Sequence, residues 1–195
     1  VYEQLTKDLR NGLIVPVFMG AAEQEHGVRR LMKALRHETP SPDDSAARLG
    51  INASGEAVAQ VFKTLHAAHS GKLSLARVWR GEISEGETLG GMRVGGLSKL
   101  MGANQTKSAK AVLGDVVALG RMDEVTTGDI LTPSGEVPEG MAPWPKPLTP
   151  VYAFALEAVN RADEVKLTGA LQRLNEEDPS VSYRQDNDIH QLVLM

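Results

Sequence analysis

The sequence predicts a mainly β fold with α/β flanks, in which an antiparallel β-barrel lies between two pieces that mix strands and helices. Three observations lead to this fold class. From residue 56 to residue 130, short apolar runs alternate with glycine-containing turns about every 8 to 12 residues, a spacing typical of antiparallel sandwiches and barrels. A strand-then-helix pattern comes before this segment, and a strand, a helix and a hairpin pattern come after it.

The first piece, residues 1–42, is expected to be the edge of an α/β sheet. Residues 13–18 form an apolar run closed by Gly20, which is the pattern of a buried strand. Apolar residues then recur at helical spacing between residues 28 and 35, and Pro40 ends that helix because the residue before a proline disfavours the α region. One strand and one helix cannot bury their apolar faces alone, so this piece is expected to need partners outside the chain.

The central unit, residues 43–137, is expected to be the barrel. Residues 40–55 have the composition of a linker. Gly95-Gly96, between Val94 and Leu97, predicts a two-residue hairpin turn, since glycine accepts the positive φ of primed turns. The strands are expected to close on themselves, because closure leaves no long unpaired edge. The expected strands are 56–65, 72–80, 87–94, 97–102 and 115–121, with a last short one near Ile130.

A second linker, residues 138–150, separates the barrel from the last unit, residues 151–195. It contains five of the ten prolines, which fit neither a helix interior nor a central strand. The last unit is expected to hold a strand at 151–157, a helix at 162–177 and a hairpin over 181–194 that turns at Asp186–Asp188. This order predicts an incomplete ferredoxin-like β-α-β-β unit.

Composition excludes several kinds of site. Hydrophobic residues make up 42% and charged residues 24%, as in folded globular domains. The absence of cysteine excludes disulfides, thiolate metal sites and a Cys nucleophile, and it fits a cytoplasmic protein. A net charge of −4 argues against a protein that coats nucleic acid by bulk charge, so any nucleic-acid contact must be local, and we expect no DNA partner. No apolar run reaches the roughly 18 residues of a membrane span, and we expect a monomer with no membrane partner.

Motifs for catalysis are absent from the sequence. The P-loop pattern G-x-x-x-x-G-K-[ST] surrounds phosphate with backbone N–H groups and a lysine, but the Gly-Lys pair at residues 71–72 continues into Leu73. His66 and His69 have no third ligand nearby, so exposed loop histidines are favoured over a metal site. Glu176–Asp178 is interpreted as a solvated helix end rather than a cation site or an acid–base pair. We therefore assign no catalytic residue and no metal ligand.

Basic side chains are frequent in the barrel segment. Because side chains alternate along a strand, some of them should share one outer face. Such a face can contact phosphate groups, or it can simply keep the barrel soluble, and the pattern alone leaves both interpretations open. The candidates for RNA contact are Arg77, Arg93, Lys99, Lys107 and Lys110.

Three stretches of the chain, in order, resemble elongation factor G and its paralogues. IVPVFMGAA at residues 14–22 resembles the end of the GTP-binding domain. The barrel resembles domain II through LARVWRGEI at 75–83, GETL at 86–89, GDVVAL at 114–119 and TTGDIL at 126–131. RADEVKL at 161–167 and ALQRLNEEDPS at 170–180 resemble the first helix of domain III.

The resemblance implies the organisation of a translational GTPase. Residues 1–42 would end a P-loop GTP-binding domain, 43–137 would be a domain II barrel, 138–150 a linker, and 151–195 the N-terminal half of domain III. We expect the chain to be an excerpt, since it begins at Val1 without a Met. The intact protein would bind GTP and Mg²⁺, hydrolyse the GTP and act on the ribosome in translocation of tRNA and mRNA.

Within that protein, this chain would supply ribosome docking and interdomain coupling. Its barrel would face small-subunit RNA, and the chain alone would hold no cofactor. Gly20, Ala21 and Ala22 match the family's segment that touches the guanine base through backbone N–H groups, with Ala21 in place of the family's serine.

Departures from the family pattern suggest a divergent paralogue. The loop at residues 101–107 lacks the expected arginine, and residues 43–70 match loosely. One alternative is therefore a ribosome-associated GTPase with a role in rescue, recycling or antibiotic protection. A second alternative is a protein-binding adaptor barrel that makes no RNA contact.

We predict that the purified chain neither hydrolyses nor measurably binds GTP, because the phosphate cradle and Mg²⁺ ligands of such enzymes lie outside its sequence. Phosphate release and nucleotide binding by the purified chain provide the measurement. Turnover above a blank, abolished by a substitution within residues 1–195, would contradict the prediction.

Overall fold

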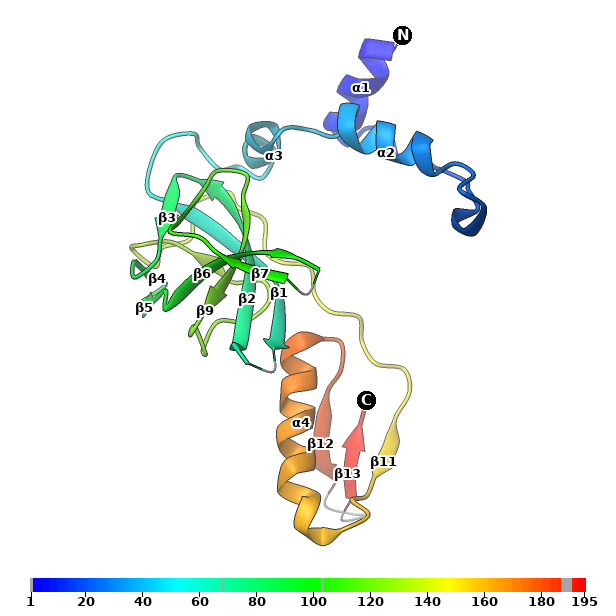
Figure 1. Cartoon of the computed structure of the whole chain (residues 1–195), viewed down its shortest axis with the longest axis vertical. Coiled ribbons are helices and arrows are strands. Elements are labelled where there is room, and N and C mark those ends of the chain that lie inside the picture. Colours follow the sequence, from blue (N-terminus) through cyan, green and yellow to red (C-terminus); the bar gives the residue numbers. More distant parts are fainter. Residues whose placement is uncertain (1, 68, 103, 187–190) are drawn as a thin grey trace.

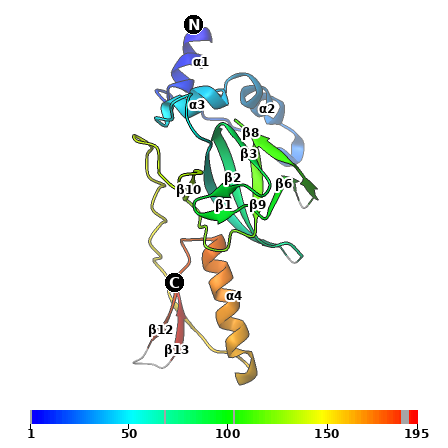
Figure 2. The same ribbon diagram turned by 90° about the vertical axis from the view of Figure 1, so that its left-hand side faces the viewer.

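The computed structural model describes residues 2–67, 69–102, 104–186 and 191–195. The chain forms three parts that follow one another along the long axis of the molecule (Figures 1 and 2). Helices lie at the N-terminal end, a β unit lies in the middle, and a helix with a small sheet lies at the other end. The order of the parts in sequence is therefore also their order in space.

The N-terminal part is helical. Its elements are α1 (Tyr2–Arg10), the 3-10 helix η1 (Ala22–Gln24), α2 (Val28–His37) and α3 (Pro42–Arg48). The helix expected from residue 28 is confirmed as α2, but the strand expected at residues 13–18 is wrong. This segment is extended and exposed, with Val15 and Val17 at 85% and 84% exposure. A strand needs a hydrogen-bonding neighbour, and no described strand lies beside this segment.

The segment 40–55 is only partly a linker, because α3 forms inside it. The Ser41 hydroxyl accepts a hydrogen bond from the Asp44 N–H at 3.1 Å, and the Asp44 carboxylate accepts one from the Ser41 N–H at 3.2 Å. Pro42 occupies the first turn, where its missing N–H costs nothing. This capping box is visible in the sequence, so α3 was predictable from it.

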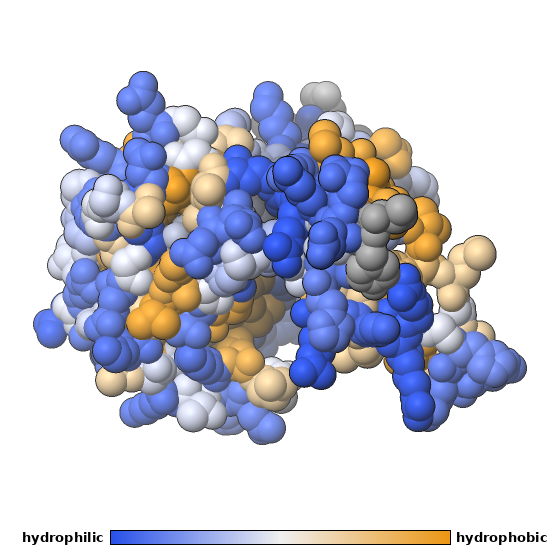
Figure 3. Space-filling model, turned by 90° about the horizontal axis from the view of Figure 1, so that it is seen from above, coloured by the Kyte–Doolittle hydropathy of each residue, from blue (hydrophilic) through white to orange (hydrophobic). Residues whose placement is uncertain are grey.

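The N-terminal part also exposes apolar side chains. Figure 3 looks down on this end of the molecule and shows hydrophobic residues at the surface among hydrophilic ones. On α2, Leu31, Met32 and Leu35 are 41%, 60% and 52% exposed. The apolar stripe that predicted this helix is thus uncovered in the described chain.

The central unit is an antiparallel β structure, as predicted. Its largest sheet has six strands in the order β10-β1-β2-β9-β6-β7, and β3–β8 and β4–β5 form two separate ribbons. The strands are β1 (Val58–Ala67), β2 (Gly71–Arg80), β3 (Glu82–Ser84), β4 (Thr88–Leu89), β5 (Met92–Arg93), β6 (Gly96–Met101), β7 (Asn104–Lys107), β8 (Lys110–Val112), β9 (Val116–Gly120) and β10 (Ile130–Leu131).

The expectation that the strands close into a ring is corrected. Strands β10 and β7 end the six-stranded sheet, and no pairing joins them within the described residues. Register shifts beside Val58 and Val61 bend β1, so the sheet coils without closing. We call this coiled unit the barrel below. Sheet and ribbons still enclose one core, formed by Ala57, Ala59, Val61, Ala76, Val78, Ile83, Leu89, Val94, Leu97, Ala111, Val117, Leu119, Met122, Val125 and Leu131.

The tight turn near the predicted hairpin lies at Gly90-Gly91. Both glycines have positive φ, 57° and 80°, as a primed turn requires, and they join β4 to β5. The hairpin predicted at Gly95-Gly96 is wrong, because β6 pairs with β9 and β7 and not with β5. Both glycine pairs satisfy the same local rule, and only the position of the partner strand distinguishes them.

A second apolar cluster attaches the flanking segments to the barrel. Ala46 of α3 and Ile51 pack on Val58 of β1, and Trp79, Leu49, Ile130 and Met141 border them. Because Met141 follows the barrel in sequence, this cluster holds both α3 and the start of the second linker against β1.

The last unit has the predicted β-α-β-β order. Its elements are β11 (Phe154–Leu156), η2 (Arg161–Asp163), α4 (Glu164–Glu177), β12 (Tyr183–Asp186) and β13 (Gln191–Leu194). Strand β13 lies between β11 and β12 and is antiparallel to both, so β11 and β12 are parallel and α4 connects them. Residues 187 and 188 of the predicted turn lie outside the described residues.

We predict that Ile83→Ala destabilises the barrel by about 2 to 5 kcal/mol, because Ile83 is fully buried and its removal leaves a cavity. Urea unfolding followed by circular dichroism provides the measurement. Val112→Ala, in the partner strand β8 and 44% exposed, is the control and should change stability far less. Equal losses for the two variants would contradict the core described above.

Candidate functional site

The segment matched to guanine contact forms a short turn. The Ala21 N–H donates to the His26 carbonyl at 3.1 Å, and the His26 N–H donates back to the Ala21 carbonyl at 3.1 Å. A Cβ on Gly20 would lie 2.6 Å from the His26 oxygen, so only glycine permits this close approach. Ala22 begins η1, and no described hydrogen bond uses its N–H. No described hydrogen bond uses the Gly20 N–H either, so of the three candidates both Gly20 and Ala22 retain a backbone N–H that could donate to an acceptor on a base.

The five basic candidates do not form one patch with equal roles. Lys99 pairs with Asp115 at 2.8 Å, and Lys110 pairs with Glu82 at 3.0 Å. The Arg77 guanidinium carbon lies 5.5 Å from the centre of the Trp79 ring, and its Nε is buried without a described partner. These three cations are engaged within the barrel.

Asp115 organises the first group. Its Oδ1 accepts from Lys99, and its Oδ2 accepts from the Val112 N–H at 3.0 Å, which links β6, β8 and the start of β9. The Lys99 ammonium, with the Val112 N–H and nearby Arg77, holds the pKa of Asp115 below its usual range. The Val112 contact closes the turn between β8 and β9, and the ion pair with Lys99 adds a link between strands.

Arg93 and Lys107 have a different setting. Both are exposed, and neither forms an ion pair with a described carboxylate. Arg93 donates from Nε to the Gly86 carbonyl at 3.2 Å and lines a cleft of about 760 Å³. Lys107 lines a smaller cleft of about 320 Å³, and Glu85 and Arg121 line both clefts. These adjoining clefts bring Arg93, Lys107 and Arg121 to one region of the barrel.

Arg121 is the member of this region that was not selected as a site residue. Its φ is 59°, a left-handed conformation that is uncommon outside glycine. A Cβ on Gly95 would lie 2.6 Å from Arg121 Cδ, so glycine at that position makes room for the arginine side chain. The contact joins positions 26 residues apart in sequence, which is why local pattern did not select Arg121.

A polar junction connects the barrel to α4, and sequence reasoning missed it. His66 Nε2 lies 2.9 Å from Glu176 Oε2, and Lys72 Nζ lies 3.2 Å from the same oxygen. The His66 N–H also donates to the Glu177 carboxylate. The interpretation of His66 as an exposed loop residue, and of Glu176 as part of a solvated helix end, is therefore wrong. We call His66, Lys72, Glu176 and Glu177 the junction.

Electrostatics at the junction favour the ionised carboxylate. Burial of Glu176 opposes its ionisation, but the hydrogen bonds from His66 and Lys72 outweigh burial and lower the pKa of Glu176. Lys72 is only 8% exposed, which makes the pair less screened than a surface pair. His69 is exposed, as expected.

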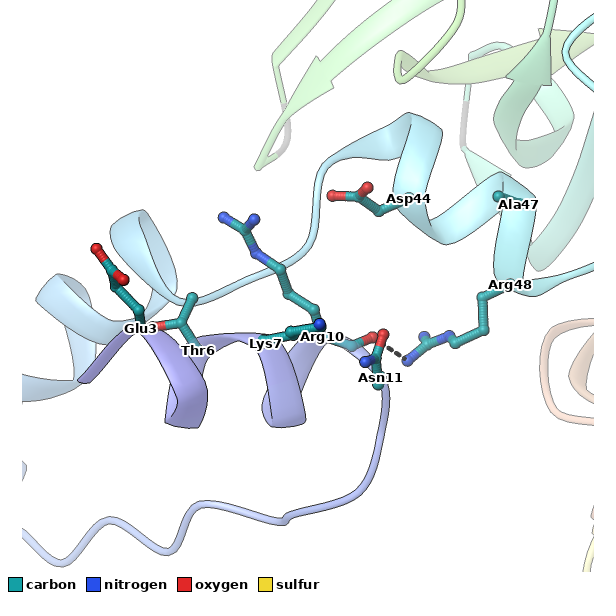
Figure 4. Close-up of a pocket in the computed structure, with 8 residues that line it drawn as sticks. All are labelled: Glu3, Thr6, Lys7, Arg10, Asn11, Asp44, Ala47 and Arg48. Carbon is teal, nitrogen blue, oxygen red and sulfur yellow. Dashed lines mark hydrogen bonds between the residues drawn. The ribbon is translucent and has the colours of Figure 1, made fainter. Parts of the chain in front are cut away.

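A cleft of about 690 Å³ lies between α1 and α3 (Figure 4). Arg48 Nη1 donates to the Arg10 carbonyl at 3.3 Å and so links the two helices. The hydrogen bonds from Ser41, with Arg10 nearby, lower the pKa of Asp44 at the rim. Among the residues that the structure describes, no group of three His, Asp or Glu side chains is placed to hold a metal ion. None of the described helices has the length and apolar character needed to cross a membrane.

Comparison with known proteins identifies the family. The model of elongation factor G, domain III, matches residues 148–195, which include β11, α4, β12 and β13. An elongation factor G-like protein from Synechocystis sp. is 42% identical over 190 residues, which cover 96% of this chain and 28% of that protein. This chain belongs to the elongation factor G-like family. Elongation factor G from Orientia tsutsugamushi is 30% identical over 209 residues, covering 97% of the chain and 29% of that protein.

Other similar proteins also align with nearly the whole of this elongation factor G-like chain. An elongation factor G-like protein from Mycobacterium tuberculosis is 29% identical over 228 residues, which cover 98% of the chain and 31% of that protein. A crystal structure of a protein from Thermus thermophilus superposes with a TM-score of 0.77 and 29% identity, covering 98% of this chain and 29% of that one. The chain thus spans less than a third of the length of these relatives.

We predict that Asp115→Asn lowers the stability of the barrel by about 0.5 to 1 kcal/mol at pH 7, because it removes the charge that pairs with Lys99. The folded-state pKa of Asp115 is depressed. Its contribution is therefore present above the unfolded-state pKa of about 3.9 and is lost as pH falls through the lower folded-state pKa.

Urea unfolding of the wild type and Asp115→Asn at pH 7 and at lower pH measures this difference. The gap in stability between the two proteins should shrink on acidification. A gap that stays constant or widens below pH 4, about the ordinary aspartate pKa, would contradict the role given to Asp115.

Proposed function

We propose that this chain is the part of a GTP-dependent translation factor that docks on the ribosome and couples its domains, and that hydrolysis occurs elsewhere in the intact protein. One observation carries the proposal: similarity to an elongation factor G-like protein covers 96% of the chain, while the P-loop pattern is absent from it. The part that is present holds a barrel with basic clefts and a unit matched by the domain III model.

The docking surface of the proposal is the region around Arg93, Lys107 and Arg121, which meets small-subunit RNA. Arginine and lysine side chains without carboxylate partners attract phosphate oxygens at little cost, because no internal ion pair must break first. Lys99, Lys110 and Arg77 contribute less, since Asp115, Glu82 and Trp79 already engage them.

In this proposal the chain contributes to guanine recognition only through residues 20–22, near its N-terminal end. The Ala22 N–H is suited to an acceptor on the base, and the alanine at position 21 does not remove it, because a backbone donor is independent of the side chain. GTP and Mg²⁺ belong to the intact protein, where bound Mg²⁺ neutralises charge on the phosphates during hydrolysis. The intact protein is proposed to be a cytoplasmic monomer.

A second candidate is a ribosome-associated GTPase with a task other than translocation, such as rescue, recycling or protection. The relative at 42% identity is named elongation factor G-like, whereas the relative named elongation factor G is 30% identical, which favours a divergent paralogue. An intact protein that binds ribosomes and hydrolyses GTP but fails to advance mRNA would favour this candidate over translocation.

We predict that Arg93→Glu with Lys107→Glu weakens binding of the chain to ribosomal small subunits in a salt-dependent way. Each lost phosphate contact should reduce the slope of log affinity against log salt by about 0.7 to 0.9, so loss of two should reduce it by roughly 1.4 to 1.8. Binding measured by sedimentation across a salt series provides the test, and thermal unfolding checks that the barrel stays folded.

Lys146→Glu with Lys166→Glu is the matched control, because it changes net charge equally at exposed positions outside the barrel. Its salt slope should stay close to that of the wild type. If the barrel variant and the wild type bind equally at low and high salt, the basic clefts do not contact RNA. Binding to a protein partner that is independent of salt would then favour the adaptor alternative.

A further inference from the structure

The last turn of α4 is held against the β1–β2 hairpin by charged and polar groups. His66 and Lys72 both contact Oε2 of Glu176, at 2.9 and 3.2 Å. The Lys63 ammonium donates to the Glu177 backbone carbonyl at 3.3 Å. All the contacts therefore come from one end of the hairpin and meet one end of the helix, as Figure 2 shows for α4 and β1.

Neither buried apolar cluster of the barrel extends to this attachment within the described chain. The two apolar clusters that include the barrel contain no side chain beyond Met141. From residue 142 to residue 153 the chain forms neither helix nor strand. Units joined by a small polar contact and an irregular linker are expected to move relative to each other, unless the contact itself holds them.

The charged side chains of the junction are partly buried, so their interactions are stronger than those of fully exposed pairs. His66, Lys72 and Glu176 have side chains that are 20%, 8% and 24% exposed. Lys72 Nζ also donates to the Asp123 carbonyl at 2.6 Å, which fixes it beside Glu176. Arg173 and Asp123 line the same cleft. Removing one partner from such a group leaves the other charge poorly solvated, so the arrangement favours a closed contact or a fully separated one.

We propose that the junction is a charge latch, in which Glu176 held by His66 and Lys72 fixes the β11–β13 unit in one orientation on the barrel. When this pairing is lost, the unit swings about the part of the linker that follows Trp144, whose side chain lies against Gly128 of the barrel. The latch gives the chain two arrangements of its domains, and the balance between them is set by one carboxylate.

The absence of cysteine makes the orientation measurable. Thr88→Cys on the barrel and Val165→Cys near the start of α4 give two exposed labelling sites in a chain with no other thiol. Val165 lies at the end of α4 opposite the junction, so a tilt of the helix changes the separation strongly. Spin labels at both sites report the distribution of distances by pulsed electron paramagnetic resonance.

The unaltered junction should give one narrow distribution at low salt. Glu176→Lys should raise the population of other separations by roughly tenfold, because it places like charges together. Lys72→Glu should do the same from the barrel side. The double variant Glu176→Lys with Lys72→Glu should restore most of the narrow population, which a loss of packing alone would not permit. Glu82→Lys, which reverses a paired carboxylate within the barrel, is the control and should leave the distribution unchanged.

Narrow distributions in both single variants, with their circular dichroism intact, would overturn the proposal. So would broadening that the double variant fails to reverse. If a single variant does not fold, Glu176→Gln decides the matter, because it removes the carboxylate charge with little change of shape and should broaden the distribution. A narrow distribution in that variant would also overturn the proposal.

Discussion

Burial of apolar side chains between the coiled β1–β2 hairpin and the short strands that face it is the interaction on which the other parts depend. Register shifts bend β1 so that a single sheet can surround Val61 and Ile83, both fully buried. The same hairpin carries contacts to each flank: α3 packs against Val58, and the far end of the hairpin carries His66. Loss of this core would therefore detach both neighbours at once.

Local sequence patterns predicted those elements whose formation depends on residues close together in the sequence. Strand alternation in β1 and β2 and the helical period in α4 act over a few residues, so they survive without knowledge of partners. Residues 13–18 have an equally strong signal, yet they remain exposed because the signal describes what a segment can bury and not what lies beside it. Gly95-Gly96 failed for the same reason, since turn chemistry does not name the strand that pairs.

The sequence indicated which basic residues could form the candidate site, but it did not indicate which of them pair with carboxylates in the folded chain. A run of basic residues indicates charge, but whether a cation is available depends on carboxylates elsewhere: Lys99 meets Asp115 across 16 positions, and Lys110 meets Glu82 across 28. The junction spans 110 positions between His66 and Glu176. The two features that looked ordinary separately, a histidine near a turn and an acidic helix end, acquire their role only through each other.

The acidic end of α4 has a consequence for folding cooperativity. Glu176 and Glu177 place negative charge where the helix dipole is already negative, which disfavours the last turn of an isolated helix. The barrel supplies the compensating groups, Lys63, Lys72 and His66. Docking on the barrel therefore protects the amide protons of that turn from exchange with solvent, in addition to the protection given by the helix itself. The exchange rate of these amides thus depends on whether the barrel is folded and in contact with the helix end.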